Sequence, residues 1–146
     1  MKNKIVIPAN RVLKFRVWNK ETKKFYTPDN EGDVIAISLD GTITSGYIDG
    51  DMTTDGNENY IPQQFTGLLD RNGKEIYEGD IVRITDKFDF SSEYPDTYEI
   101  KYELNNSDSI YPAGFKLKSK KNKTCVWSYK ALIIVGNIFE TPELLK

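Results

Sequence analysis

The chain of 146 residues contains no histidine and a single cysteine, Cys125. Without histidine, Ser-His-Asp and Cys-His mechanisms lose their general base, and histidine-ligated catalytic metals are excluded. One cysteine cannot form an intramolecular disulfide or, in a chain without histidine, complete a structural zinc site. Cys125 stands beside Val126 and Trp127, where a cysteine usually behaves as a small buried hydrophobe. We therefore expect no catalytic residues of these kinds, no metal and no cofactor.

Phosphate-binding loops and long apolar runs are also missing. The sequence has no GxxxxGK[ST] motif and no GxGxxG that opens a helix, which disfavours nucleotide-dependent enzymes. The N-terminal apolar run covers only Ile5 to Ile7 before Pro8, too short for the core of a signal peptide. No later segment approaches the ~20 apolar residues of a membrane span. We expect a cytoplasmic protein that does not use a membrane.

The composition is that of a globular protein. Hydrophobic residues make up 38% of the chain, aromatic residues 12% and charged residues 29%, which supplies both a core and a solvated surface. A chain of this length can bury a core without disulfides or metals. Because no repeat or Pro/Gly/Ser-rich linker divides it, we predict one domain over residues 1–146.

The net charge of −2 hides an asymmetry along the chain. Residues 1–25 hold eight Lys/Arg and one acid, residues 26–70 hold nine acids and no base, and residues 71–146 hold twelve of each. The basic and acidic segments can pair across the fold or across a subunit contact. The basic segment can also be a nucleic-acid footprint.

Alternation with a period of two predicts most of the strands. Leu13, Phe15 and Val17 alternate with Lys14, Arg16 and Trp18, so each set is predicted to lie on one face of a strand. A polar run from Asn19 to Lys24 then turns the chain, and Phe25 and Tyr26 begin a returning strand. A second hairpin is predicted around Asp40-Gly41, a dipeptide typical of a type I′ turn. Residues 49–59 are polar and without periodicity, so we predict a loop there.

The C-terminal half continues the same pattern. Residues 97–104 alternate cleanly, with the apolar positions 98, 100, 102 and 104 predicted to face inward. A strand, a lysine-rich turn and a second strand follow, and then a buried run from Ala131 to Val135 that ends at Gly136. Thr141 and Pro142 predict the N-cap and first turn of a short C-terminal helix.

These elements together predict a mainly β fold. Successive short strands joined by hairpins, with no sustained helical periodicity, favour an antiparallel sheet curled into a small barrel, with hairpin extensions and a short C-terminal helix. The stretch "EGDIVRI" also looks like the start of a strand in SH3-like small barrels. That analogy concerns the fold alone.

One lysine-rich hairpin is a candidate nucleic-acid surface. Lysines could hold phosphates there while nearby aromatic side chains stack on bases. A hairpin tip made of lysines is also an ordinary means of keeping a sheet edge soluble. Both interpretations stay open. The candidate residues are Arg16, Lys116, Lys118, Lys120, Lys121 and Lys123.

The acidic residues offer weaker candidates for chemistry. Asp49, Asp51 and Asp55 cluster, but neither Asp49 nor Asp55 begins a loop with the spacing of a calcium-binding EF-hand. A solvated loop is the favoured interpretation. A carboxylate-based hydrolase would need two acids that face one pocket, and their separation in space cannot be derived from the sequence.

Three separated stretches resemble one family. "LKFRVWNKETKKFY", "QQFTGLLDRNGKEIYEGDIV" and "IIVGNIFETPELL" occur in the order found in the YopX family of small phage and prophage proteins. The resemblance implies a β-rich fold and residence in the cytoplasm of a bacterial host, and it carries no assigned activity. The matching motif positions are Phe15, Arg16, Trp18, Thr66, Gly67, Asp70, Asn72, Gly73, Glu78, Gly79, Asp80, Gly136, Asn137, Pro142 and Leu144.

Most of these positions have structural explanations. Asn72-Gly73 is the strongest short turn signal in the chain. Gly67 and Gly79 suit tight backbone positions, Asp80 can accept hydrogen bonds from nearby amides, and Gly136 fits a bend or bulge. We therefore expect a non-enzymatic accessory protein that binds another protein or itself. A small barrel that binds nucleic acid is the alternative.

Overall fold

The computed structural model describes residues 12–26, 33–38, 40–47, 51–54, 57–85, 97–104, 113–120, 124–125 and 131–145. The secondary structure in these ranges is β-strand with two short 3₁₀ turns, η1 (Asn57–Asn59) and η3 (Pro142–Leu144). The strands are β1 (Phe15–Asn19), β2 (Lys24–Tyr26), β3 (Asp33–Ile37), β4 (Ile43–Tyr47), β5 (Met52–Thr53), β6 (Tyr60–Leu69), β7 (Glu75–Tyr77), β8 (Asp80–Ile84), β9 (Thr97–Glu103), β10 (Gly114–Lys118), β11 (Thr124–Cys125) and β12 (Leu132–Asn137).

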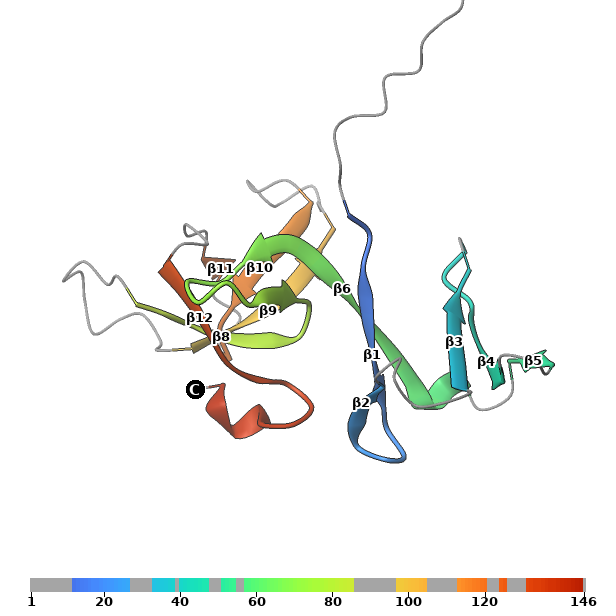
Figure 1. The fold of residues 1–146 in the computed structure, drawn as a ribbon. Coiled ribbons are helices and arrows are strands. Elements are labelled where there is room, and N and C mark those ends of the chain that lie inside the picture. The colour runs from blue at the N-terminus through green and yellow to red at the C-terminus, as the bar shows by residue number, and fades with distance from the viewer. Residues whose placement is uncertain are drawn as a thin grey trace, which may run out of the picture.

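Three antiparallel sheets form from these strands (Figure 1). The largest has the order β11-β10-β9-β8-β12 and curls into a half-barrel, while β2-β1-β6-β7 and β3-β4-β5 form the other two. The long strand β6 pairs with β1 through its first half and with β7 through its second half. Since β7 leads directly into β8, β6 connects the second sheet to the half-barrel (Figure 1).

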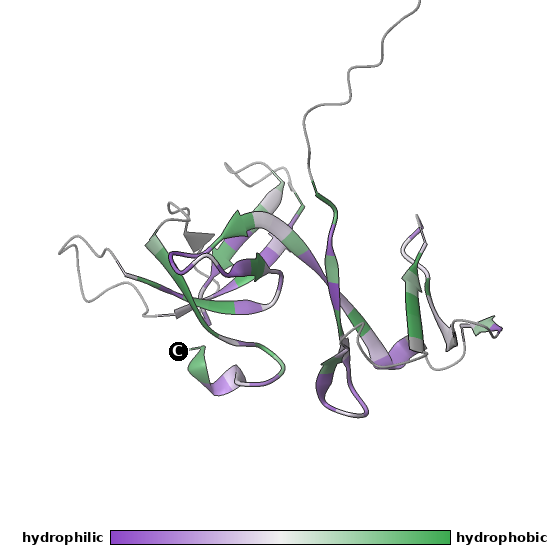
Figure 2. Ribbon diagram, in the orientation of Figure 1, coloured by the Kyte–Doolittle hydropathy of each residue, from purple (hydrophilic) through white to green (hydrophobic). Residues whose placement is uncertain are grey.

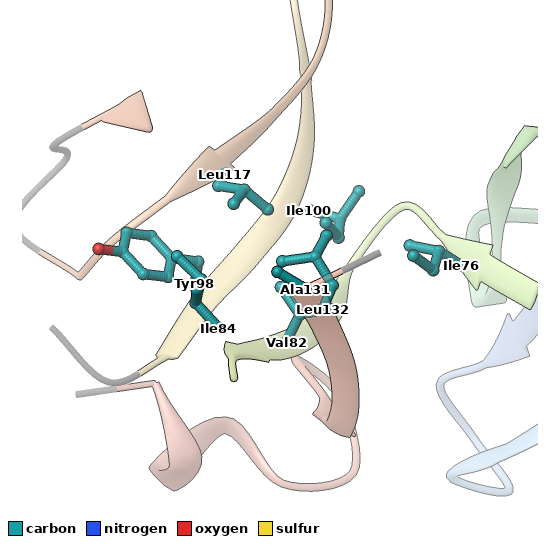
Figure 3. Close-up of a cluster of buried hydrophobic side chains, with 8 residues drawn as sticks. All are labelled: Ile76, Val82, Ile84, Tyr98, Ile100, Leu117, Ala131 and Leu132. Carbon is teal, nitrogen blue, oxygen red and sulfur yellow. The ribbon is translucent and has the colours of Figure 1, made fainter. Parts of the chain in front are cut away.

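The apolar core lies in the half-barrel (Figure 3). It contains the fully buried Val82 of β8 and Tyr98 of β9, with Leu132 of β12 beside them and Ile76 reaching in from β7. Hydrophobic residues follow these strands and also the segment that leads into β1 (Figure 2). The predicted mainly β, antiparallel and curled architecture is thus confirmed in outline.

The hairpin around Asp40-Gly41 has a different turn from the predicted type I′ turn. The Gly41 N–H bonds to the Ser38 carbonyl at 2.9 Å, and the Ser38 N–H to the Thr42 carbonyl at 2.9 Å. Gly41, with φ +86°, is therefore the fourth residue of the turn and not a central one. This is a three-residue loop with a glycine bulge, which supplies the same twist as a type I′ turn.

The hairpin between β6 and β7 repeats this pattern. Gly73 donates to the Asp70 carbonyl at 2.9 Å and Asp70 donates to the Lys74 carbonyl at 2.7 Å, with Gly73 at φ +80°. The turn predicted from Asn72-Gly73 is confirmed. Both glycines take the left-handed conformation that other residues adopt only with strain.

Other expectations need correction. Part of the predicted loop at 49–59 forms β5, which pairs with β4, and the 3₁₀ turn η1; Asp49 and Asp55 lie outside the described residues. On β9, Tyr98 and Ile100 are buried, but Tyr102 and Leu104 are 42% and 78% exposed because the strand extends beyond the core.

The predicted C-terminal helix is a single 3₁₀ turn at Pro142–Leu144. Thr141 makes no side-chain cap, because its hydroxyl oxygen accepts the Asn137 N–H at 3.1 Å instead. No helix in the described ranges is long and apolar enough to cross a membrane.

Candidate functional site

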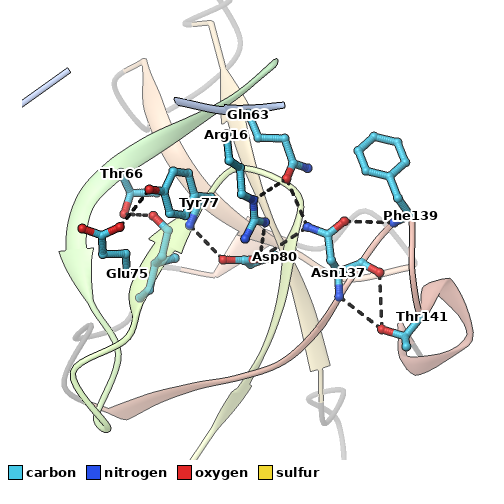
Figure 4. A network of polar contacts seen from close by, with 10 residues as sticks. Arg16, Gln63, Thr66, Glu75, Tyr77, Asp80, Asn137, Phe139 and Thr141 are labelled. Carbon is cyan, nitrogen blue, oxygen red and sulfur yellow. Dashed lines mark hydrogen bonds and ion pairs between the residues drawn. The ribbon is translucent and has the colours of Figure 1, made fainter. Parts of the chain in front are cut away.

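A buried polar network joins the second sheet to the half-barrel (Figure 4). At its centre, Asp80 of β8 is 1% exposed and its Oδ1 accepts a hydrogen bond from Arg16 Nη2 of β1 at 2.5 Å. Asp80 Oδ2 accepts the Tyr77 N–H at 2.8 Å. Gln63 Oε1 of β6 accepts Arg16 Nε at 2.8 Å. The network thus connects β1, β6, β7 and β8 through side chains that are distant in sequence.

Asn137 ties the last strand to the same centre. Its Nδ2 donates to Gln63 Oε1 at 3.2 Å and to Asp80 Oδ1 at 3.3 Å. Its Oδ1 accepts the Phe139 N–H at 3.0 Å, which turns the chain sharply after β12. The predicted bulge at Gly136 is confirmed by the register shift between Ile134 and Gly136. A Cβ at Gly136 would lie 2.0 Å from Thr141 Oγ1, so only glycine fits.

Gly79 places Asp80 at the start of β8. It adopts φ +78°, donates its N–H to the Ile100 carbonyl at 2.7 Å and accepts the Ile138 N–H at 2.9 Å. A Cβ at this position would lie 2.0 Å from Gln63 Nε2. The glycine therefore allows both the turn from β7 into β8 and the close approach of the network.

Aromatic rings enclose the cation of Arg16. Its guanidinium carbon lies 4.4 Å from the ring centre of Phe25 on β2 and 4.7 Å from that of Tyr77 on β7, distances at which the ring quadrupoles attract a cation. The ring centre of Trp18 lies 5.0 Å from that of Phe25 in an edge-to-face arrangement. It lies 5.3 Å from the ring centre of Phe139, on which Trp18 stacks. The ion pair is thus shielded and held between two sheets.

These contacts make the network structural. Asp80 accepts three hydrogen bonds and is almost fully buried, so its lone pairs serve the fold rather than a substrate. The predicted amide contact of Asp80 is confirmed. What the arrangement does is fix the angle between the second sheet and the half-barrel.

A second buried carboxylate protects the outer edge of the half-barrel. Asp70 Oδ1 accepts the N–H groups of Asn72 and Lys74, each at 2.9 Å, and its Oδ2 accepts the Ile134 N–H at 3.1 Å. The neighbouring Arg71 N–H bonds to the Leu132 carbonyl at 2.9 Å. The β6–β7 hairpin tip therefore binds the edge of β12 and covers groups that would otherwise attract another strand.

The pKa of Asp70 reflects these bonds. Burial pushes it upward, but the N–H groups of Ile134, Lys74 and Asn72 and the charge of Lys74 together hold the pKa below its ordinary value of 3.8. A depressed pKa in the folded state means that the carboxylate stabilises the fold above about pH 3.8. This stabilisation is lost as the pH falls through the folded-state pKa.

The Asp70→Asn variant is expected to lose about 1–3 kcal/mol of unfolding free energy at neutral pH, because an amide N–H₂ then faces the Ile134 N–H. The difference from the unaltered protein should shrink below pH 3.8. Urea unfolding at several pH values measures both. Asp40→Asn is the control, since Asp40 is exposed and caps a turn through Thr42. Equal losses in the two variants, or a difference that grows at low pH, would contradict this role for Asp70.

The basic N-terminal segment pairs with other acids than expected. Lys14 Nζ donates to both oxygens of Glu75, at 2.8 and 2.7 Å, and Glu75 Oε2 also accepts the Tyr77 hydroxyl at 2.8 Å. These bonds lower the pKa of Glu75. Both Glu75 and Asp80 lie outside the acidic segment 26–70. Lys14 and Arg16 therefore bind the β7–β8 region, and Lys20 bonds the Glu58 carbonyl.

The lysine candidates do not form one surface in the described part of the chain. Arg16 binds Asp80 in the network. Lys116 is 7% exposed and lies 3.6 Å from Glu103, while Lys118 binds Glu103 at 2.7 Å. Lys120 is exposed, and Lys121 and Lys123 lie outside the described residues. Arg16, Lys116 and Lys118 thus have acidic neighbours that offset their charge.

Two glutamates lie near one another beside β9. The pKa of Glu99 is raised, mainly because the residue is half-buried, with the charge of Lys101 opposing the shift and that of Glu78 adding to it. Glu78 Oε1 accepts the Tyr102 N–H at 3.4 Å. Burial alone raises carboxylate pKa values in many proteins, so this pair gives no particular support to a hydrolase.

Exposed apolar side chains gather at one end of the β1–β6 pair. Phe15 lies opposite Gln64, and the Phe65 N–H bonds to the Lys14 carbonyl at 2.8 Å. Beyond this point β6 bends toward β7, while the chain before Lys14 runs away from it (Figure 1). We call this region the apolar end. Its exposed members are Val12, Leu13, Phe15, Leu68 and Leu69, at 60%, 67%, 42%, 39% and 46%.

The structure brings most motif positions together around the network. Trp18, Gly79, Asp80 and Asn137 lie in or against it, as described above. Thr66 donates to the Ile76 carbonyl at 2.8 Å, Gly67 has φ +86°, and the Leu144 carbonyl accepts the Thr97 hydroxyl at 2.5 Å. No local pattern predicted the roles of Gln63, Phe25 and Phe139, because these roles depend on contacts between distant segments.

Comparisons with known proteins agree with this arrangement. The family model described as YopX protein matches residues 14–146. The chain is 26% identical to protein EF1440 from Enterococcus faecalis, whose crystal structure aligns over 92% of this chain and 99% of that chain with a TM-score of 0.54. It is 25% identical to protein yopX from Bacillus subtilis, over 90% and 95% of the two chains, with a TM-score of 0.51. No curated protein matches.

Proposed function

The chain belongs to the YopX family, and from this premise we propose that it is a non-enzymatic accessory module that binds another protein or itself through the apolar end. The family resemblance supports a phage or prophage origin and action in the cytoplasm of a bacterial host. Asp70 and Asp80 are buried carboxylates of the described chain, and their hydrogen bonds hold parts of the fold together. Binding, rather than catalysis, is the role that the described surface supports.

The observation that carries the proposal is the exposure of five large apolar side chains on one end of a strand pair. Burying a Leu or Phe side chain contributes about 1.5–3 kcal/mol relative to leaving it in water. Contiguous exposed apolar surface of this kind marks interaction sites in soluble proteins. The network around Asp80 holds β1 and β6 firmly, so the apolar end is presented on a rigid support.

Lysine at position 13 or 69 is expected to weaken association. In light scattering behind size exclusion, the unaltered chain should show a mass above its 16.8 kDa, and Leu13→Lys and Leu69→Lys should return it toward that value. Leu104→Lys is the matched control, because Leu104 is 78% exposed and directly follows β9 of the five-stranded sheet. A strict monomer that also captures no host or phage protein would contradict the proposal.

Nucleic-acid binding through the lysine-rich hairpin is the alternative. Of its candidate residues, Arg16, Lys116 and Lys118 have acidic neighbours, which favours the protein-binding role. A salt-dependent shift of single-stranded or duplex probes would revive the alternative, because phosphate binding weakens steeply with salt. Passage through a heparin column at low salt would count against it.

A further inference from the structure

In the described part of the chain, no strand pairs with the side of residues 13–15 that faces away from β6. The Lys14 carbonyl accepts from Phe65, and the Lys20 N–H donates to the Asn59 carbonyl, so even-numbered positions of this strand bond to β6. The backbone groups of Leu13 and Phe15 therefore point the other way. On that side β2 pairs only with residues 17–19, and no other strand of the described chain pairs there (Figure 1).

An open edge that carries exposed apolar side chains is a template for another strand. The edge of β12, in contrast, is covered by the hairpin tip at Asp70 and Arg71. Leu13 and Phe15 are 67% and 42% exposed. In the described part of the chain, this edge thus combines backbone groups that no strand pairs with and exposed apolar side chains.

We propose that this edge pairs antiparallel with the same edge of a second copy of the chain, Leu13 of one copy lying opposite Phe15 of the other. This inference rests on the proposed function and names the partner and the register. A two-fold pair of this kind is closed, since each edge is used once by an identical edge. Leu13 and Phe15 then form cross-strand apolar contacts twice.

The alternative symmetric registers are less favourable. Moving the axis to Phe15 would place the partner's Leu13 opposite Val17, a position already paired with Tyr26 of β2. Moving it to Leu13 would set Phe15 opposite a position outside the described residues, so Phe15 would gain no described apolar partner. With the axis at Lys14, both apolar residues gain apolar partners.

Charge also permits this register. The two Lys14 residues would face one another across the axis, and like charges in that position are destabilising. Each Lys14, however, is bound by both oxygens of Glu75. The charges of Lys14 and Glu75 from the two copies would then alternate between positive and negative around the axis. Because the paired segments are short, the dimer should be weak and concentration-dependent, as small interfaces are.

Disulfide cross-linking tests the register. In a Cys125→Ser background, Lys14→Cys should form a disulfide dimer several-fold faster than Leu13→Cys or Phe15→Cys. Residues on the axis face each other as a non-hydrogen-bonded pair with Cα atoms about 4.5 Å apart, within the range of a disulfide. Leu104→Cys, at an exposed position directly after β9, measures random collision.

The outcomes separate this inference from the proposed function. Fastest cross-linking through Lys14→Cys supports the paired edge. Fastest cross-linking through position 13 or 15 overturns the register, and rates equal to that of Leu104→Cys overturn the pairing itself. If the pairing fails while Leu69→Lys still abolishes association or capture of a protein, the proposed function stands without it.

Discussion

The Asp80→Ala variant is expected to lose about 3–5 kcal/mol of unfolding free energy, because removing one partner of a buried ion pair leaves the other charge uncompensated. Arg16 would keep only Gln63 and the two aromatic rings. The Tyr77 N–H would lose its acceptor, and Asn137 one of its two. Since domains are stabilised by about 5–15 kcal/mol in total, the loss should be visible as partial unfolding at low urea concentration.

Glu75→Ala provides the matched control for Asp80→Ala. It breaks the ion pair between Lys14 and Glu75, whose side chains are 48% and 39% exposed respectively. Exposed ion pairs contribute about 0–1 kcal/mol. Asp80→Asn should lie between the two, because it keeps an acceptor for Tyr77 but removes the charge. If Asp80→Ala costs no more than Glu75→Ala in urea unfolding, the network does not join the sheets as described.

The Gly79→Ala variant is expected to lose about 2–5 kcal/mol, from two causes that add. Alanine at φ +78° is strained by about 1–2 kcal/mol, and its Cβ would displace Gln63 from the position where it accepts from Arg16, at an overpacking cost of about 1–3 kcal/mol. Thermal or urea unfolding measures the sum.

Gly73→Ala isolates the backbone part of this cost. Gly73 has a similar φ of +80°, and a Cβ there would meet nothing within 4 Å. It should lose only the backbone part, about 1–2 kcal/mol. Equal losses at positions 73 and 79 would show that the space beside Gln63 is not limiting, and no loss at position 73 would contradict the turn itself.

The sequence predicted local features well. Alternation and turn residues placed the β1–β2 and β6–β7 hairpins, the tight backbone at Gly67 and Gly79, and the bulge at Gly136, because each depends on a few neighbouring residues. The turn at Asp40-Gly41 was assigned one residue out of register, since Asp-Gly suits both a type I′ turn and a glycine bulge.

Contacts between distant segments could not be predicted. The Arg16–Asp80 pair joins residues 64 positions apart, and nothing in either local sequence shows that they meet. The even-numbered alternation correctly placed Arg16 and Trp18 on one face, where both contact Phe25. The inward assignment failed at Tyr102 and Leu104, because alternation shows the face of a strand but not where the core ends.

Sedimentation velocity of the unaltered chain, from low micromolar to several hundred micromolar, tests most directly whether the protein associates through the apolar end. We expect a reversible shift from the 16.8 kDa monomer toward twice that mass as concentration rises, and no such shift for Leu13→Lys. A sedimentation coefficient that stays at the monomer value throughout, or a shift that Leu13→Lys leaves unchanged, would contradict self-association through this end of the molecule.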